Sequence, residues 1–146
     1  MVITYYEIIG SLRHYLQDTT NVPTIWKYYG YSKPDTKPFA EIEYVVSTED
    51  IKTKTKELIT EDITLVIGVH GDTMSEMSLA YKDIISILRY GNIPIYNEDF
   101  EKIGSFSPEV ENVSNIMFGT HEENEGNTHR LYIEVSVPIY HVKERR

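Results

Sequence analysis

The sequence predicts an α+β fold, with a mainly antiparallel sheet and two principal helices packed on one face. The first observation is period-two hydropathy from Thr60 to His70, which is typical of a strand with one apolar face. The second is the helical spacing of apolar residues from Met77 to Leu88. The third is that the other apolar segments are short, which favours hairpins. All 146 residues are expected to form a single domain, since this length buries a core without disulfides.

Two segments are expected to be helices. Residues Ile3–Asp18 carry apolar side chains at spacings of three and four, and Pro23 prevents the helix from continuing. The second helix is expected between Thr73 and Gly91. Thr73 and Glu76 have the spacing of a capping box, and Gly91 is expected to follow the last helical residue.

Five more segments are expected to be strands or to lie in hairpins. In chain order they are Thr24–Tyr29, Phe39–Val46, Ile51–Ile59, Ser114–Phe118 and Arg130–Tyr140. The segment Ile51–Ile59 is interpreted as a solvated strand or hairpin arm that leads to the central strand. Glu41 and Glu43 are expected on the polar face of their strand, and Pro138 indicates an edge position or a bulge.

The connections between these elements are expected to be polar. Asn92–Pro108 is interpreted as irregular and acidic, and His121–Asn127 as a polar turn. Eight acidic residues and one basic residue lie between Glu98 and Glu125, so this segment alone carries a charge of −7. The register of a strand within residues 109–120 stays open.

Composition excludes several classes of protein. The net charge of −9 argues against a general nucleic-acid-binding protein, because neutralising phosphates requires clustered Lys and Arg. The absence of cysteine excludes disulfides and thiolate metal sites. The apolar runs are too short to cross a membrane, and the N-terminus lacks the features of a signal peptide. Synthesis in the cytoplasm is therefore expected.

Two short motifs have a faint likeness to catalytic or phosphate-binding sites. Gly68 and Gly71 precede a helix, but the Gly-Lys-Ser/Thr ending of a phosphate-binding loop is missing. His70 and Asp72 lie two residues apart at the end of a strand, which is more typical of an exposed polar edge than of a proton-transfer pair.

Two clusters have a faint likeness to binding sites. The possible metal ligands are His121, Glu122, Glu123, Glu125 and His129, without the residue order of a calcium loop. The possible base-stacking aromatics are Trp26, Tyr28, Tyr29 and Tyr31, with few basic neighbours. A solvated hairpin tip and ordinary packing explain these clusters better. The sequence therefore predicts no catalytic residue, no cofactor and no metal site.

Lys52, Lys54 and Lys56 recur at every second position. A strand would place all three side chains on one face. Such a stripe either protects an edge strand from aggregation or forms a contact surface, and both interpretations stay open.

The order of these patterns resembles the tail-terminator, or neck, proteins of long-tailed bacteriophages. The resemblance covers most of the chain. Its segments are Tyr5-Tyr6-Glu7-Ile8-Ile9 leading to Leu12-Arg13, Val22-Pro23-Thr24-Ile25-Trp26, Lys37-Pro38-Phe39, Thr64–Val69 with Gly71 and the Met77–Leu88 helix, and Leu131–Ile139. The acidic stretch Glu98–Glu125 is longer than the family pattern.

The resemblance implies a structural virion protein without enzymatic activity or cofactor. Its copies would form a ring, usually a hexamer, which caps the tail tube, stops its polymerisation and joins tail to head. The implied partners are the tail-tube protein and a head connector or stopper protein, while genomic DNA only passes through the lumen. The alternatives are a head-completion stopper, a tail-tube subunit, or a small host-acting binding module or enzyme.

A ring requires one patch of a subunit to dock on a different patch of its neighbour. We therefore hypothesise that Lys52, Lys54 and Lys56 lie near the acidic segment of the next copy. Glu122, Glu123 and Glu125 are the acidic residues expected in this contact.

Overall fold

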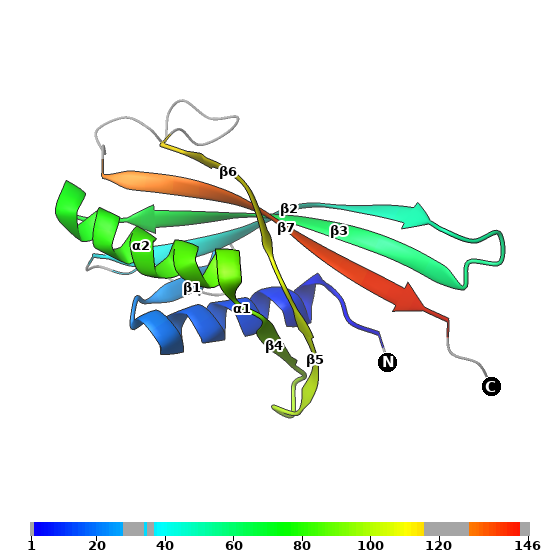
Figure 1. The fold of residues 1–146 in the computed structure, drawn as a ribbon. Helices are drawn as coiled ribbons and strands as arrows, with labels where there is room; N and C mark the ends of the chain where they lie inside the picture. The colour runs from blue at the N-terminus through cyan, green and yellow to red at the C-terminus, as the bar shows by residue number, and fades with distance from the viewer. Residues whose placement is uncertain (1, 28–33, 35–36, 116–128, 144–146) are drawn as a thin grey trace.

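The fold is α+β, as the sequence predicts. The computed structural model describes residues 2–27, 34, 37–115 and 129–143. These residues form two helices and seven strands (Figure 1). The elements are α1 (Tyr5–Thr20), β1 (Thr24–Trp26), β2 (Phe39–Ile51), β3 (Leu58–His70), α2 (Met74–Tyr90), β4 (Ile93–Tyr96), β5 (Lys102–Phe106), β6 (Glu109–Ser114) and β7 (Arg130–Val142).

Five strands form one sheet in the order β1-β2-β3-β7-β6, with β3 at its centre. The short β1 runs parallel to β2, and all other neighbours in this sheet are antiparallel. The strands β4 and β5 form a separate hairpin. Both helices lie on the same side of the large sheet, so one sheet face is covered and the architecture has two layers (Figure 1).

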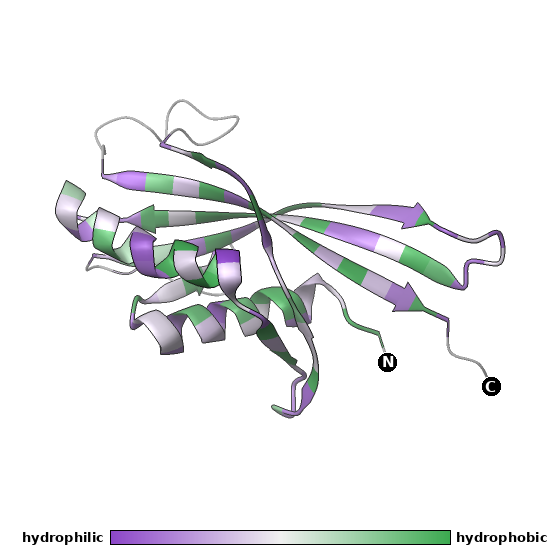
Figure 2. Cartoon of the chain, viewed as in Figure 1, coloured by the Kyte–Doolittle hydropathy of each residue, from purple (hydrophilic) through white to green (hydrophobic). Residues whose placement is uncertain are grey.

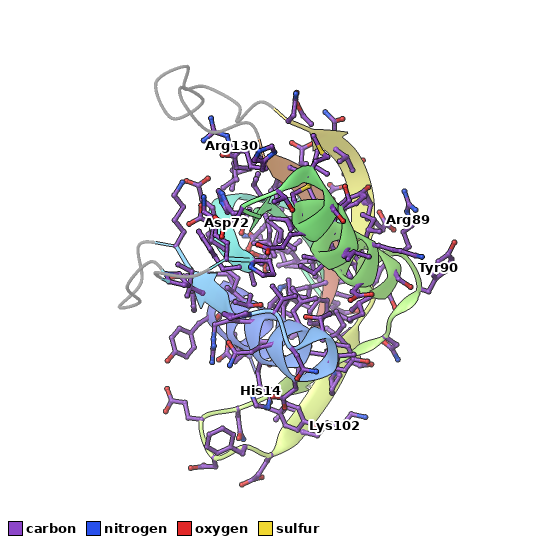
Figure 3. All side chains as sticks on the ribbon, turned by 90° about the vertical axis from the view of Figure 1, so that its left-hand side faces the viewer. His14, Asp72, Arg89, Tyr90, Lys102 and Arg130 are labelled. Carbon is purple, nitrogen blue, oxygen red and sulfur yellow. The ribbon has the colours of Figure 1, made fainter. Side chains whose placement is uncertain are left out.

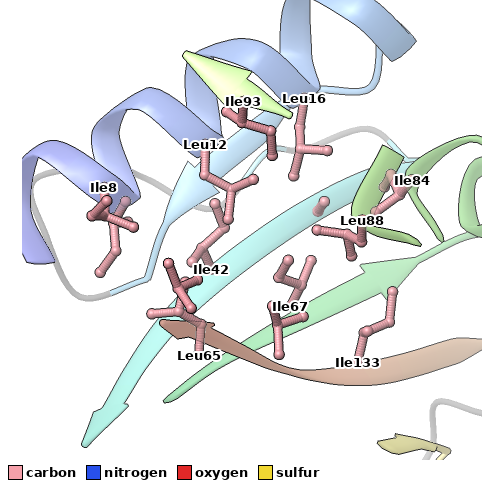
Figure 4. Close-up of a cluster of buried hydrophobic side chains, with 14 of the residues drawn as sticks. Ile8, Leu12, Leu16, Ile42, Leu65, Ile67, Ile84, Leu88, Ile93 and Ile133 are labelled. Carbon is pink, nitrogen blue, oxygen red and sulfur yellow. The ribbon is translucent and has the colours of Figure 1, made fainter. Parts of the chain in front are cut away.

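The core lies between the helices and the covered sheet face. Ile63, Leu65, Ile67 and Val69 are fully buried, as the alternating pattern predicts. They pack in one cluster with apolar residues of both helices and of β7 (Figure 4). The helix residues of this cluster are Ile8, Ile9, Leu12, Leu16, Ala80, Ile84, Ile85 and Leu88. The sheet and the two apolar helix stripes therefore account for one continuous core.

The helix α1 begins two residues later than predicted because Thr4 caps it. The Thr4 hydroxyl accepts a hydrogen bond from the Tyr6 N–H, and the Thr4 N–H donates to the Glu7 carboxylate at 2.9 Å. Together they complete a capping box that the sequence interpretation missed. Burial raises the pKa of Glu7, but the hydrogen bonds from Thr4 outweigh this effect and hold the pKa below its ordinary value.

We expect Thr4→Ala to lower the free energy of unfolding by about 1 kcal/mol, the usual value of an N-cap hydroxyl. Because the pKa of Glu7 is lowered on folding, its contribution is present above the unfolded-state pKa and is lost as the pH falls through the folded-state pKa. Urea melts at neutral and acidic pH measure both effects. The exposed Thr19, at the other end of the helix, is the control for threonine truncation. Equal losses for Thr4→Ala and Thr19→Ala would contradict the capping role.

The helix α2 occupies the predicted range between Thr73 and Gly91. The Thr73 hydroxyl accepts from the Glu76 N–H at 3.1 Å, but the Glu76 carboxylate accepts from Asp72 rather than from Thr73. Gly91 is the C-cap residue and has extended backbone, with φ of −80°. A Cβ at this position would lie 2.5 Å from the Ile87 carbonyl oxygen, so the close approach explains the glycine.

Several strand boundaries differ from the prediction. The strand β1 ends at Trp26, and β2 continues beyond Val46 to Ile51, with an irregularity in register between Tyr44 and Val46. Extension of β2 is possible because its whole length pairs with β3. At the C-terminal end, β7 also continues to Val142 for the same reason.

The prediction that Asn92–Pro108 is irregular is wrong, because β4 and β5 form a hairpin within it. Ile93, Ile95 and Phe106 are buried in the main core, and the Tyr96 N–H donates to the Ser11 hydroxyl of α1 at 2.9 Å. This contact with a distant helix, rather than a long alternating pattern, stabilises these short strands.

The strand β6 covers Glu109–Ser114 and so shares only Ser114 with the strand predicted at Ser114–Phe118. Its register is set by pairing with β7, in which Glu109 lies opposite Ser136 and Ser114 opposite Tyr132. Residues 116–118 and the predicted turn His121–Asn127 lie outside the described residues. Pro138 lies beyond the last residue of β7 that pairs with β6, consistent with the predicted edge position.

Candidate functional site

The outer parts of β2, β3 and β7 extend past the helices as a three-stranded projection (Figure 1). We call this projection the arm and define it as residues 45–62 and 138–142. Apolar segments continue toward its outer end (Figure 2). Its exposed apolar side chains are Val45, Val46, Ile51, Tyr140 and Val142, with exposed fractions of 48–72%. An apolar surface of this kind is a candidate for contact with another protein.

Both long edges of the arm are open within the described part of the chain. The strand β1 pairs only with residues 40–42 of β2, and β6 pairs only with residues 132–136 of β7. The backbone groups on the outer sides of β2 and β7 are therefore available for hydrogen bonds along the arm. Open strand edges of this type are templates for pairing with another chain.

The charged residues of the arm are arranged in local pairs. The Lys52 ammonium donates to the Asp50 carboxylate at 2.6 Å, and this hydrogen bond raises the pKa of Lys52. On the helix-facing side of the sheet, His141 Nε2 and the Glu61 carboxylate are 2.9 Å apart. Glu49 is exposed and takes part in no ion pair among the described residues.

The prediction that Lys52, Lys54 and Lys56 share one strand face is wrong. The three lysines lie in the exposed turn that joins β2 to β3 at the tip of the arm. Thr53 closes this turn, because its hydroxyl accepts from the Glu57 N–H at 2.9 Å and its carbonyl from the Lys56 N–H at 3.1 Å. Lys56 takes the left-handed conformation, with φ of 59°. The lysines therefore form a charged tip instead of a stripe.

The acidic side of the predicted contact, Glu122, Glu123 and Glu125, lies outside the described residues. Pairing between these residues and the three lysines of a neighbouring copy therefore stays a prediction.

A second candidate site lies on the sheet face away from the helices. His70 is 3% exposed, and its Nε2 is 3.0 Å from the carboxylate of Glu41, which is 6% exposed. Phe39 stacks on the His70 ring with a centroid distance of 4.6 Å, and Tyr132 meets it edge-on at 6.2 Å. The predictions of an exposed His70 and of Glu41 on a solvated face are therefore wrong, and His70 pairs with Glu41 instead of Asp72.

Arg130 lies opposite His70 in the ladder between β3 and β7, at the end of the molecule away from the arm (Figure 3). Its Cζ is 6.0 Å from the centre of the Tyr132 ring. Its Nε and Nη2 atoms are buried and make no hydrogen bond with any of the described residues. Sequence reasoning missed this cluster, although charged residues at facing strand ends were a usable signal.

In the described ranges, no group of three or more His, Cys, Asp or Glu side chains comes together as a metal site. The pair formed by Glu41 and His70 is enclosed by aromatic rings, which suits a structural role in holding β2 against β3.

Comparison with known proteins neither supports nor contradicts the resemblance to neck proteins. Neither the family models nor the curated proteins with which the chain was compared match it. No helix among the described residues has the length and apolar character needed to cross a membrane.

Proposed function

We propose that this protein is a structural subunit of a bacteriophage neck, which forms a ring on the end of the tail tube. The ring would stop addition of tail-tube protein and present a surface to the head connector or stopper protein. The observation that carries this proposal is the arm, which has exposed apolar residues and an open strand edge on each side. Two different edges on one subunit suit the heterologous contact that a ring requires.

The order of the sequence patterns supports the same proposal, because it resembles that of tail terminators. The net charge of −9 is consistent with a ring through which DNA passes without binding. The proposed location is accordingly the neck of the virion, after synthesis in the host cytoplasm, and the proposed oligomer is a hexamer. A head-completion stopper and a tail-tube subunit would use the same kind of ring contact.

Imaging of the purified protein with tail tubes tests the proposed function. We expect negative-stain micrographs to show rings, and tubes that carry a ring at one end should no longer lengthen when tail-tube protein is added. Tubes mixed with tail-tube protein alone are the control. Stacking of this protein into tubes of its own would favour a tail-tube subunit. Binding to the head connector without binding to tubes would favour a stopper, and absence of both rings and tube binding would contradict the proposal.

A further inference from the structure

We infer that the arms of neighbouring copies join edge to edge, with β2 of one copy pairing in parallel with β7 of the next. This inference rests on the proposed ring, and it names the strands and backbone groups that make the contact. It follows from the direction of the backbone groups, from the position of Pro138 and from the charges on the two edges.

The outward backbone groups of β2 follow from its hydrogen bonds. In an antiparallel ladder, successive residues direct their N–H and C=O groups alternately toward and away from the partner strand. The Lys52 N–H donates to the Leu58 carbonyl at 3.0 Å, so Lys52 faces β3. Counting back from Lys52 by alternation, the N–H and C=O groups of Ser47, Glu49 and Ile51 face the open side.

The outward backbone groups of β7 follow in the same way. The Lys143 N–H donates to the Glu57 carbonyl at 2.8 Å, so the odd-numbered residues of the outer part of β7 face β3. The backbone groups of Pro138, Tyr140 and Val142 therefore face the open side. Pro138 has no N–H, so at this position the edge offers only a carbonyl.

These two edges are complementary in direction. Both β2 and β7 are antiparallel to β3, so they run the same way and a contact between adjacent copies of the sheet is parallel. In a parallel pair, every second residue directs its N–H and C=O groups to the partner strand, and it bonds there to the two residues that flank the one opposite it. With Glu49 opposite His141, the Glu49 N–H donates to the Tyr140 carbonyl and its own carbonyl accepts from the Val142 N–H.

The same register accommodates the proline. Ser47 then lies opposite Ile139, so its N–H donates to the Pro138 carbonyl and its carbonyl accepts from the Tyr140 N–H. No hydrogen bond in this register requires an N–H from Pro138. The pairing also places Val46 beside Pro138 on the outer sheet face, which covers apolar surface that is exposed in the single chain.

Pairing of identical edges is less favourable. Two β2 edges related by a two-fold axis would bring together the acidic side chains of Glu49 and Asp50 from both copies, and like charges on facing strands are destabilising. Two β7 edges would place Pro138 where an antiparallel ladder needs a donor. In the mixed pairing, the acidic β2 edge meets residues 138–142 of β7, which include no acidic residue and are followed by Lys143. The two edges therefore favour a heterologous contact over a two-fold dimer.

Proline substitutions test each edge separately. In Glu49→Pro and Tyr140→Pro, the lost N–H faces the open side, so no hydrogen bond between described residues of the chain is removed. We expect wild type to assemble and each variant alone to remain a monomer. Mixed together, the two variants should form a complex of twice the 17.0 kDa monomer mass and no larger species, because each retains the edge that the other lacks. Glu49→Ala and Tyr140→Ala, which keep the N–H, are the controls that should still assemble.

Light scattering coupled to size-exclusion chromatography measures these masses, and circular dichroism checks that each variant is folded. Assembly of either proline variant alone, or a mixture that stays monomeric, would overturn the inference. Neither result would contradict the proposed ring, because its copies would then join through another contact. A wild-type protein that stays monomeric with and without tail tubes would contradict the proposed ring as well.

Amide hydrogen exchange of the unmodified protein provides a test that does not depend on the variants folding. We expect the amides of Glu49, Ile51, Tyr140 and Val142 to exchange at least tenfold more slowly in the assembly than in the diluted monomer. The Thr55 amide, in the turn at the tip, should show no such change. Equal exchange of the four edge amides in both states would overturn the inference.

Discussion

Ile67→Ala and Ile84→Ala are each expected to lower the free energy of unfolding by about 2–5 kcal/mol. Both side chains are fully buried in the cluster that joins β3 to α2. Truncation leaves a cavity between two elements that cannot easily move together, because β3 is held by a strand on each side. Urea or thermal melts measure the loss.

Leu79→Ala is the matched control, because Leu79 lies on the same helix and is 63% exposed. We expect its effect to be within about 0.5 kcal/mol of zero, as is usual for surface positions. Unchanged stability in both isoleucine variants would contradict the packing of α2 on β3.

Glu41→Ala is expected to lower the free energy of unfolding by about 3 kcal/mol. The substitution leaves the His70 imidazole buried without the carboxylate that contacts it. The expected loss of stability lies between the cost of leaving a buried hydrogen-bonding group unpaired and the cost of breaking a buried ion pair. The double variant Glu41→Leu/His70→Phe should recover part of the loss, because it removes both polar groups and keeps an aromatic ring beside Phe39.

The pair of Glu61 and His141 on the arm offers a control with the same residue types and a similar distance of 2.9 Å. Its side chains are 14% and 28% exposed, compared with 7% and 4% for Glu41 and His70. We therefore expect Glu61→Ala to cost only about 0–1 kcal/mol. Equal costs for the two glutamates, measured by chemical denaturation, would show that burial does not set the strength of the pair formed by Glu41 and His70.

Local patterns were sufficient to predict the central strand and the helix that follows it. The alternation around Ile67 and the helical stripe that includes Ile84 each come from neighbouring residues, and both place the same side chains in the core. The α+β class follows from the same patterns, because a sheet with one apolar face requires helices to cover it.

The features that the sequence did not predict depend on contacts and lengths that a hydropathy pattern does not show. Glu41 is a polar residue on the polar side of its strand, and only the register of β2 against β3 places it beside His70. The arm was also missed in part, because the turn at Thr53 depends on side-chain hydrogen bonds and not on hydropathy. The hairpin of β4 and β5 has too few residues for a periodic pattern to be decisive.

The central position of β3 has a consequence for how the chain folds during synthesis. Its partner β2 is adjacent in sequence, but β7 pairs with it across a separation of 60 residues or more, as Gly68 opposite Tyr132 illustrates. Such contacts raise the contact order and slow folding. While the ribosome is still making the segment before Arg130, β3 keeps one unpaired edge and part of its apolar face uncovered. Nascent chains at this stage are therefore the most susceptible to aggregation and to chaperone binding.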